Sequence, residues 1–276
     1  MSTAICFAHS NLIDTSTLSG GSWRSAYDLD RLNDATYGRA LGLSIARSTT
    51  AAEADSIIDM DHGSAKSAQV FYIPAHNLSS AATVRLERGT TAGGTDVYAG
   101  TDLAAWPFAP LDAVYSGRYF GVCIITPAAT SARYTRIRIK DSANTAGYVQ
   151  VTRPFLGQLF APEYGPKKLD HDWQSLSNVE RTEGGADWIY KRTPLRSANV
   201  VYSALSTAEA SELHEIIRLH DTTSEVVYIA DRNDRSRQQQ YGFLALMREL
   251  GKFDYAWWTL QGVALGFDQR GGAPAV

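Results

Sequence analysis

The sequence predicts a mainly β protein, in which an N-terminal sandwich or jelly roll precedes a smaller α+β domain. Two observations predict this fold class. Short apolar or alternating runs recur over residues 1–160, with turns rich in glycine and asparagine between them. Beyond residue 170, one helix with a clear N-terminal signal interrupts a second series of strand-like runs. Such elements bury one face each against another layer.

Five runs predict the strands of the first half. Residues 57–63 (IIDMDHG) lead into a turn, and residues 70–73 form a short apolar run. Residues 83–88 alternate polar and apolar, as a half-buried strand does. Residues 119–125 are almost all apolar, which indicates a central strand covered on both faces, and residues 134–140 alternate again.

A segment with two prolines and a glycine separates the halves, at residues 161–169. Proline lacks a backbone donor, so this segment favours neither a helix nor a central strand. The sequence therefore predicts a jelly-roll β-sandwich over residues 1–160, a linker over 161–169 and an α+β domain over 170–276.

The second half begins with a hairpin signal. Residues 179–183 and 188–192 are strand-like runs on either side of Gly184 and Gly185. Glycine adopts the positive φ of tight turns without steric cost, so the loop is expected at this pair. Residues 198–205 predict the next strand.

The clearest helix start of the chain follows. Ser206 and Glu209 have the spacing of a capping box, in which each residue satisfies a free backbone N–H of the other. Apolar residues then recur at helical spacing as far as His220. Further strands are predicted over residues 225–230, 241–247 and 256–267, although residues 246–250 (LMREL) also fit a helical turn.

Charge and hydropathy exclude several function classes. The 276 residues carry a formal net charge of −3, whereas an electrostatic nucleic-acid binder usually has a basic excess. No apolar run approaches the roughly 18 residues that read as a membrane-spanning helix. The N-terminus lacks the basic start and apolar stretch of a secretory signal. We expect a protein assembled in a cytoplasm, without nucleic-acid binding or membrane insertion.

Cys6 and Cys123 are the two cysteines, and both lie in apolar, strand-like surroundings. We expect two buried thiols, because free cysteine packs as a small hydrophobic residue. Two cysteines alone do not establish a disulfide, and the ligand clusters of a zinc site are missing from the sequence.

Catalytic signatures are missing as well. The sequence has no phosphate-binding glycine motif, no HExxH and no GxSxG, and its Gly-Gly pairs read as turns. His171 lies between two aspartates and could form a metal corner, but a solvated loop is the favoured interpretation. We therefore predict a protein that is not an enzyme and has no cofactor or metal ion.

Two carboxylate groupings keep a chemical alternative open. Asp59 and Asp61 share one face of a strand and could form a glycosidase pair, although a strand end is favoured. Asp141 and Asn144 could hold calcium with nearby carbonyls, although a turn with local hydrogen bonds is favoured.

Two groups of side chains are candidate contact sites. Along residues 134–140 the isoleucines share one face and three cations share the other, which forms a basic ridge. This ridge is either a solvated face or a contact for a glycan, a phosphate or an acidic neighbour. Aromatic rings could stack on sugars or be buried in an interface, with core packing as the default. The candidate interface or glycan contacts are Trp23, Trp106, Arg136, Arg138, Lys140 and Tyr148.

Several first-half phrases resemble, in order, the N-terminal module of tailed-bacteriophage minor tail and baseplate proteins. The phrases are residues 11–13, 22–23, 32–34, 46–48, 57–63, 76–78 and 133–148. The resemblance implies a discoidin-like or galactose-binding-like jelly roll. The second half is similar to the small split barrel with one helix of tail-tube and distal-tail proteins, whose last strand would correspond to residues 257–265. That strand often ends in acidic residues in the family, whereas here Gly266, Phe267 and Asp268 follow.

The resemblance implies a structural component of a phage virion, at the distal tail or the baseplate. Such a protein would form a homo-oligomeric ring, contact other tail proteins and be assembled in the host cytoplasm. Closed rings follow from heterologous contacts whose rotation closes, and aromatic and arginine side chains suit such interfaces. The alternative is a carbohydrate-binding module for host surface glycans. A glycan-cleaving enzyme is a third interpretation, which requires a deep cleft with a carboxylate pair.

Overall fold

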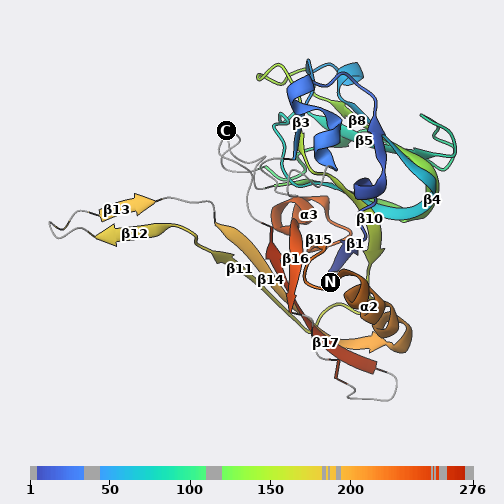
Figure 1. The fold of residues 1–276 in the computed structure, drawn as a ribbon. Helices are drawn as coiled ribbons and strands as arrows, with labels where there is room; N and C mark the ends of the chain where they lie inside the picture. The colour runs from blue at the N-terminus through green and yellow to red at the C-terminus, as the bar shows by residue number, and fades with distance from the viewer. Residues whose placement is uncertain are drawn as a thin grey trace.

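The computed structural model shows a mainly β protein, as the sequence predicts (Figure 1). Two β-rich halves share one path of paired strands, and one main helix, α2 (Thr207–His220), belongs to the second half. The described residues are 5–33, 44–109, 120–181, 185, 187–190, 194–249, 251, 253–254 and 260–270.

The first half is a β-sandwich. Its main layer has the order β10–β4–β8–β5, and β3 and β9 form a second, two-stranded sheet. Ala46 and Val151 from that second sheet share a core with Ile58 and Ile137 from the main layer, so the two sheets pack face to face. The strands are β2 (Thr17–Ser19), β3 (Ile45–Arg47), β4 (Ile57–Ile73), β5 (Thr83–Gly89), β6 (Tyr98–Ala99), β7 (Leu103–Ala104), β8 (Val122–Lys140), β9 (Gln150–Thr152) and β10 (Phe155–Phe160).

β4 and β8 are each one long strand where the sequence predicts two short ones. Polar residues separate the predicted runs, and in the structure these polar stretches pair with each other, for example Lys66 with Ala132 and Ser67 with Ser131. Backbone groups alone form the antiparallel ladder, so the two strands continue together past the edge of the core. Shifts in the pairing register on either side of the polar stretch mark where β4 and β8 extend beyond the core. Residue 119 of the predicted 119–125 strand lies outside the described residues.

The second half is an α+β unit with the strand order β11–β14–β17–β16–β15. The predicted strands at residues 198–205 and 225–230 are confirmed. The strand predicted over residues 241–247 begins at Phe243, because Tyr241 ends a short helix, and the alternative of a helical turn over residues 246–249 is wrong. Residues 256–259 of the predicted last strand lie outside the described residues. The strands are β11 (Lys168–Gln174), β14 (Leu195–Ser206), β15 (Glu225–Ile229), β16 (Phe243–Glu249) and β17 (Leu260–Gln269).

The capping box at the start of α2 is confirmed. Ser206 accepts a hydrogen bond from the Glu209 backbone, and the Glu209 carboxylate accepts one from the Ser206 backbone. Ala210, Leu213 and Ile216 form the buried stripe of the helix. A second helix, α3 (Arg235–Tyr241), is not predicted, because its sequence RSRQQQY has no apolar period.

Strand β1 (Cys6–His9) joins the two halves. It pairs antiparallel with β10 on one side and with β15 on the other, so backbone hydrogen bonds run from one half into the other. Between β10 and β11, residues 161–167 form no strand, in the segment where the sequence predicts a linker. Cys6 and Cys123 are both buried in a small core at this junction, which confirms the predicted buried thiols.

A buried ion-pair network crosses the same junction. The Arg153 side chain follows β9 and is 1% exposed. Its guanidinium donates hydrogen bonds to Glu225 of β15 at 2.7 Å and to Asp14 at 2.5 Å. The Glu225 carboxylate also faces Arg270, beyond β17. The network therefore ties the first half to the second through a buried Arg153–Glu225 pair, with Asp14 and Arg270 partly exposed at its two ends.

Short 3-10 helices connect the strands of the first half. Together with α2 and α3 they are the helices of the described residues, and none of these is long and apolar enough to cross a bilayer. The 3-10 helices with printed bounds are η1 (Leu12–Thr15), η2 (Ser25–Tyr27), η3 (Leu29–Leu32) and η5 (Glu53–Asp55).

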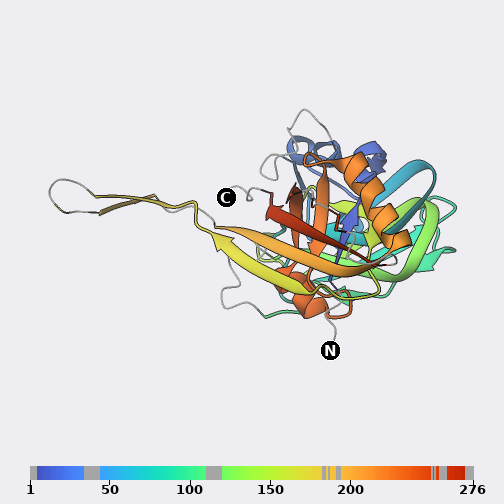
Figure 2. The ribbon, with the colours of Figure 1, turned by 90° about the horizontal axis from the view of Figure 1, so that it is seen from below.

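The predicted hairpin at residues 179–192 is confirmed and forms an arm. Strands β12 (Asn178–Arg181) and β13 (Asp187–Tyr190) pair with each other and with no other described strand. They continue outward from β11 and β14, and two perpendicular views show the pair extending away from the body (Figures 1 and 2). We refer to β12 and β13 together as the hairpin arm.

Candidate functional site

The predicted basic ridge is neutralised by carboxylates of the same chain. The Arg136 guanidinium donates two hydrogen bonds to the Asp59 carboxylate of β4, at 2.6 and 2.8 Å. Arg138 donates to Glu87 of β5 at 3.0 Å. Lys140 donates to Asp102 at 2.8 Å. The acidic neighbours of the ridge are therefore carboxylates of the protein itself, in pairs that are partly buried.

The Asp59 and Asp61 carboxylates do not resemble a hydrolytic pair. Each carboxylate accepts hydrogen bonds from an arginine. Arg136 donates to Asp59, and Arg133 donates to the two oxygens of Asp61 at 2.8 and 2.9 Å. These bonds lower the pKa of Asp61 to about 2. A general acid needs a pKa near the working pH, so Asp61 is not suited to protonate a leaving group.

The residues considered as calcium or metal ligands, Asp141, Asn144 and His171, bond to other groups of the protein. The Asp141 carboxylate accepts hydrogen bonds from the Ser79 backbone at 2.9 Å and from the Asn144 side chain at 2.8 Å. Such bonding is what the turn interpretation predicts. His171 hydrogen-bonds the Tyr228 hydroxyl at 2.8 Å and stacks on Tyr241. Among the described residues no group of three His, Cys, Asp or Glu is placed to hold a metal ion.

Trp23 and Trp106 anchor loops to the core of the sandwich. Both are half-buried and pack against the first core. The Trp23 indole N–H donates to the backbone carbonyls of Gly20 and Ile57, at 3.1 and 3.2 Å. The Trp106 N–H donates to the Leu78 carbonyl at 3.0 Å. A buried indole usually finds such a partner, so both rings serve packing rather than an open sugar-stacking surface.

His76 lies against Trp106 and makes stability dependent on pH. Its Nδ1 accepts a hydrogen bond from the Leu78 backbone at 3.1 Å, which requires that nitrogen to be unprotonated. Burial lowers its pKa to about 4 from the usual 6.5. The stabilising contribution is thus complete above pH 6.5 and is lost as the pH falls towards 4, by on the order of 3 kcal/mol.

Chemical unfolding at a series of pH values should therefore give a lower free energy of unfolding at pH 4.5 than at pH 7. His9 and His62, whose pKa burial also lowers to about 4, add to this slope. In His76→Asn, the amide oxygen can accept the same backbone hydrogen bond without titrating. This variant should show a flatter pH profile, and an unchanged profile would contradict the assignment to His76.

Tyr148 belongs to a surface cluster of arginine and tyrosine side chains. The Arg47 guanidinium lies 4.2 Å from the ring centroid of Tyr27 and 5.4 Å from that of Tyr148. The Arg24 guanidinium lies 4.6 Å from the Tyr148 centroid. These distances are those of cation–π contacts. We name Arg24, Tyr27, Arg47 and Tyr148 the arginine–tyrosine cluster.

Backbone pairing brings the cluster together. Trp23 forms a β-bridge with Ser48, and the Arg24 N–H donates to the Arg47 carbonyl at 2.9 Å. These backbone contacts hold the loop that carries Arg24 beside Arg47. Strand β3 pairs with β9 so that Arg47 lies opposite Gln150, two residues after Tyr148. In Figure 1, β3 is at the end of the molecule opposite β17.

Sequence reasoning identified Tyr148 but missed the other members of this cluster. Arg24 and Tyr27 follow the Ser22–Trp23 phrase, and Arg47 lies within residues 46–48, so all three were near phrases that carried the family resemblance. No local pattern marks them as neighbours of Tyr148, because β3 and β9 are about a hundred residues apart in the chain and meet only through pairing.

The hairpin arm carries large apolar side chains in contact with solvent. Val179 and Ile189 are a cross-strand pair, 59% and 67% exposed. Trp188 and Tyr190 point to the opposite face and are 62% and 53% exposed. Both faces of the arm therefore carry large apolar side chains, beside polar residues such as Glu180 and Arg181.

Exposed apolar residues are concentrated at the arm and at its base. Of the large hydrophobic side chains that are exposed among the described residues, all but Leu219 lie between Tyr164 and Tyr190. An isolated two-stranded ribbon is marginally stable in water, and a contiguous exposed apolar patch indicates an interaction surface. The arm is thus the strongest candidate for a protein contact.

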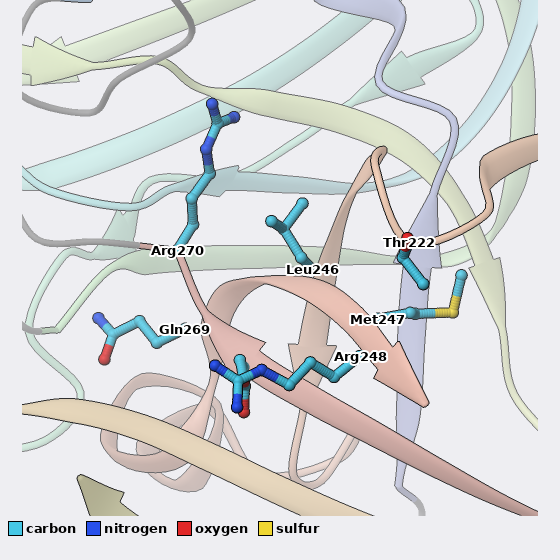
Figure 3. Close-up of a pocket in the computed structure, with 7 residues that line it drawn as sticks. Thr222, Leu246, Met247, Arg248, Gln269 and Arg270 are labelled. Carbon is cyan, nitrogen blue, oxygen red and sulfur yellow. The ribbon is translucent and has the colours of Figure 1, made fainter. Parts of the chain in front are cut away.

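A hollow of 410 Å³ is lined by residues of the paired strands β16 and β17, by Thr222 and by Arg270 (Figure 3). Arg248 and Arg270 point in different directions there. Arg248 pairs with Asp268, and Arg270 pairs with Glu225, so both cations at the hollow have a carboxylate partner in the chain.

No family model and no curated protein matches the chain. Solved structures with some similarity include SpGH29, at 13% identity and a TM-score of 0.36 over 54% of this chain and 28% of that one. Another is CBM32-1 from a family 31 glycoside hydrolase of Clostridium perfringens, at 13% identity and a TM-score of 0.36 over 53% and 96% of the two chains. A fucolectin from striped bass (Morone saxatilis) serum has 8% identity and a TM-score of 0.33 over 97% and 94%. Similarity at this level carries no argument about function.

Proposed function

We propose that this protein is a structural subunit that assembles with copies of itself through the hairpin arm. The observation that carries the proposal is the exposure of Val179, Ile189, Trp188 and Tyr190 on the two faces of the arm. An apolar ribbon of this kind gains stability when a partner covers both faces, since burial removes apolar surface from water.

A second copy of the chain is the partner that this geometry favours. The arm extends beyond the body, so it can reach an adjacent subunit rather than fold back (Figure 2). Strand β11 is the outermost strand of the sheet path and has a described strand partner on one side only, β14. An open sheet edge beside the arm offers backbone groups to the same neighbour. Head-to-tail contacts form a ring when the rotation between subunits closes.

The resemblance of the first half to tail and baseplate modules suggests where the ring would lie. We propose the distal tail or baseplate of a tailed bacteriophage, with other tail proteins as further partners. Cryo-electron microscopy of purified particles tests both parts. We expect a symmetric ring at the tail tip, with each arm buried against a neighbouring copy. A ring with free arms would contradict the assembly mechanism, and absence of the chain from particles would contradict the virion location.

A second function, carbohydrate binding, is favoured by the arginine–tyrosine cluster. The Arg47 and Arg24 guanidinium groups lie over the half-buried rings of Tyr27 and Tyr148, which help to hold them in place, and they offer several N–H donors. The hydroxyl groups of a glycan can accept hydrogen bonds from such donors. A glycan array probed with the purified protein tests this function, and no bound glycan would contradict it.

A further inference from the structure

We propose that the arginine–tyrosine cluster selects sugars that carry a carboxylate, such as uronic acids. The inference rests on the carbohydrate-binding function proposed above and names the ligand class of the same site. It follows from the charge state of the cluster, from the orientation of its arginines and from the rigidity of its surroundings.

The first step concerns charge. Within the described part of the chain, neither Arg24 nor Arg47 forms an ion pair, whereas Arg136 and Arg138 of the ridge both face carboxylates. Either guanidinium could therefore bind an anionic ligand without the loss of an ion pair within the described residues. A third arginine, Arg31, lies 5.3 Å from the Tyr27 centroid.

Two carboxylates in the segment between β3 and β4, Asp55 and Glu53, are held by partners outside the cluster. Asp55 accepts hydrogen bonds from the Thr49 and Thr50 hydroxyls, at 3.2 and 2.6 Å. Glu53 lies 3.7 Å from Arg138 and 3.6 Å from Lys140. Neither of these two acids is paired with Arg24 or Arg47.

The second step concerns direction. The Arg47 Nε donates to the Gln150 side-chain oxygen at 2.8 Å, and its guanidinium lies over Tyr27. These two contacts fix the guanidinium plane and leave the terminal N–H groups for a ligand. A planar guanidinium matches the two oxygens of a carboxylate, and charge-assisted bonds of this type are about twice as strong as neutral ones.

The third step concerns rigidity. The Asn77 side chain donates to the Tyr148 carbonyl at 2.9 Å and accepts from the Gln150 N–H at 2.7 Å. The Val149 N–H donates to the Ser48 hydroxyl at 2.8 Å. The residues around Tyr148 are thus held from both sides before any ligand binds, which lowers the entropic cost of binding. A carboxylate bound by the terminal N–H groups of Arg47 would lie beside Tyr148, whose ring centroid is 5.4 Å from that guanidinium.

Matched sugars test the inference. An array of uronate-bearing glycans and their neutral counterparts identifies ligands, and titration calorimetry then compares trigalacturonate with its methyl ester. We expect binding of the acid, with an affinity that falls as salt rises, and at least about tenfold weaker binding of the ester. Arg24→Gln combined with Arg47→Gln should weaken acid binding by at least about tenfold. Arg133→Gln, an exposed arginine paired with Asp61, is the control and should bind as the parent.

Each other result has a defined meaning. Equal binding of acid and ester would leave carbohydrate binding in place and overturn the selectivity for carboxylates. Acid binding that the double variant does not weaken would overturn the assignment to this cluster. Binding of no glycan of either class would overturn both the inference and the carbohydrate-binding function, while circular dichroism of the variants confirms that the fold is retained.

Discussion

Arg153→Ala is expected to lower the free energy of unfolding by about 3–5 kcal/mol, since it removes one partner of a buried ion pair. The Arg153 and Glu225 side chains are 1% and 3% exposed, and their hydrogen bond of 2.7 Å links the sandwich to the second half. The same guanidinium donates to the Leu32 carbonyl at 3.2 Å and to Asp14. Alanine would leave the buried Glu225 carboxylate without this donor and remove the other two hydrogen bonds.

Urea unfolding followed by tryptophan fluorescence measures this loss. The matched control is Arg133→Ala, because the Arg133 guanidinium also grips a carboxylate with two bonds, but its side chain is 45% exposed. Exposed pairs contribute about 0–1 kcal/mol, so the control should unfold close to the parent. Similar losses in the two variants would contradict the view that burial makes the Arg153 network important.

Trp188→Ser with Ile189→Ser is expected to abolish or strongly weaken assembly while the subunit stays folded. The two side chains are 62% and 67% exposed on opposite faces of the hairpin arm, so they contribute little to the core of the isolated chain. In an interface, a buried aromatic anchor commonly contributes about 2 kcal/mol or more, which corresponds to roughly 30-fold in affinity.

Particle incorporation and mass photometry measure assembly, and thermal unfolding checks the fold. Leu219→Ser is the control, because Leu219 is 62% exposed on α2 and lies away from the arm. The control should assemble normally. Normal assembly of the arm variant, or equal loss in both variants, would contradict the role of the arm.

The sequence alone was sufficient where the signal is local. The capping box of Ser206 and Glu209 predicts the start of α2, because both partners lie within one helical turn. Glycines between two strand-like runs predict the hairpin of β12 and β13, because the two strands and their loop are adjacent in the sequence. Helix α3 escaped prediction, since its side chains do not show the apolar period and Asp234 alone caps it.

The tertiary structure decided which residues share a surface and which charges remain available. Arg136 and Arg47 are both arginines on strands, yet pairing places Arg136 opposite Asp59 and Arg47 opposite Gln150. The Arg136 charge is therefore paired with a carboxylate, whereas Arg47 faces a neutral amide. Tyr148 joins Arg24 only because β3 and β9 pair, and such long-range pairing depends on the packing of the whole core, which no short window of sequence contains.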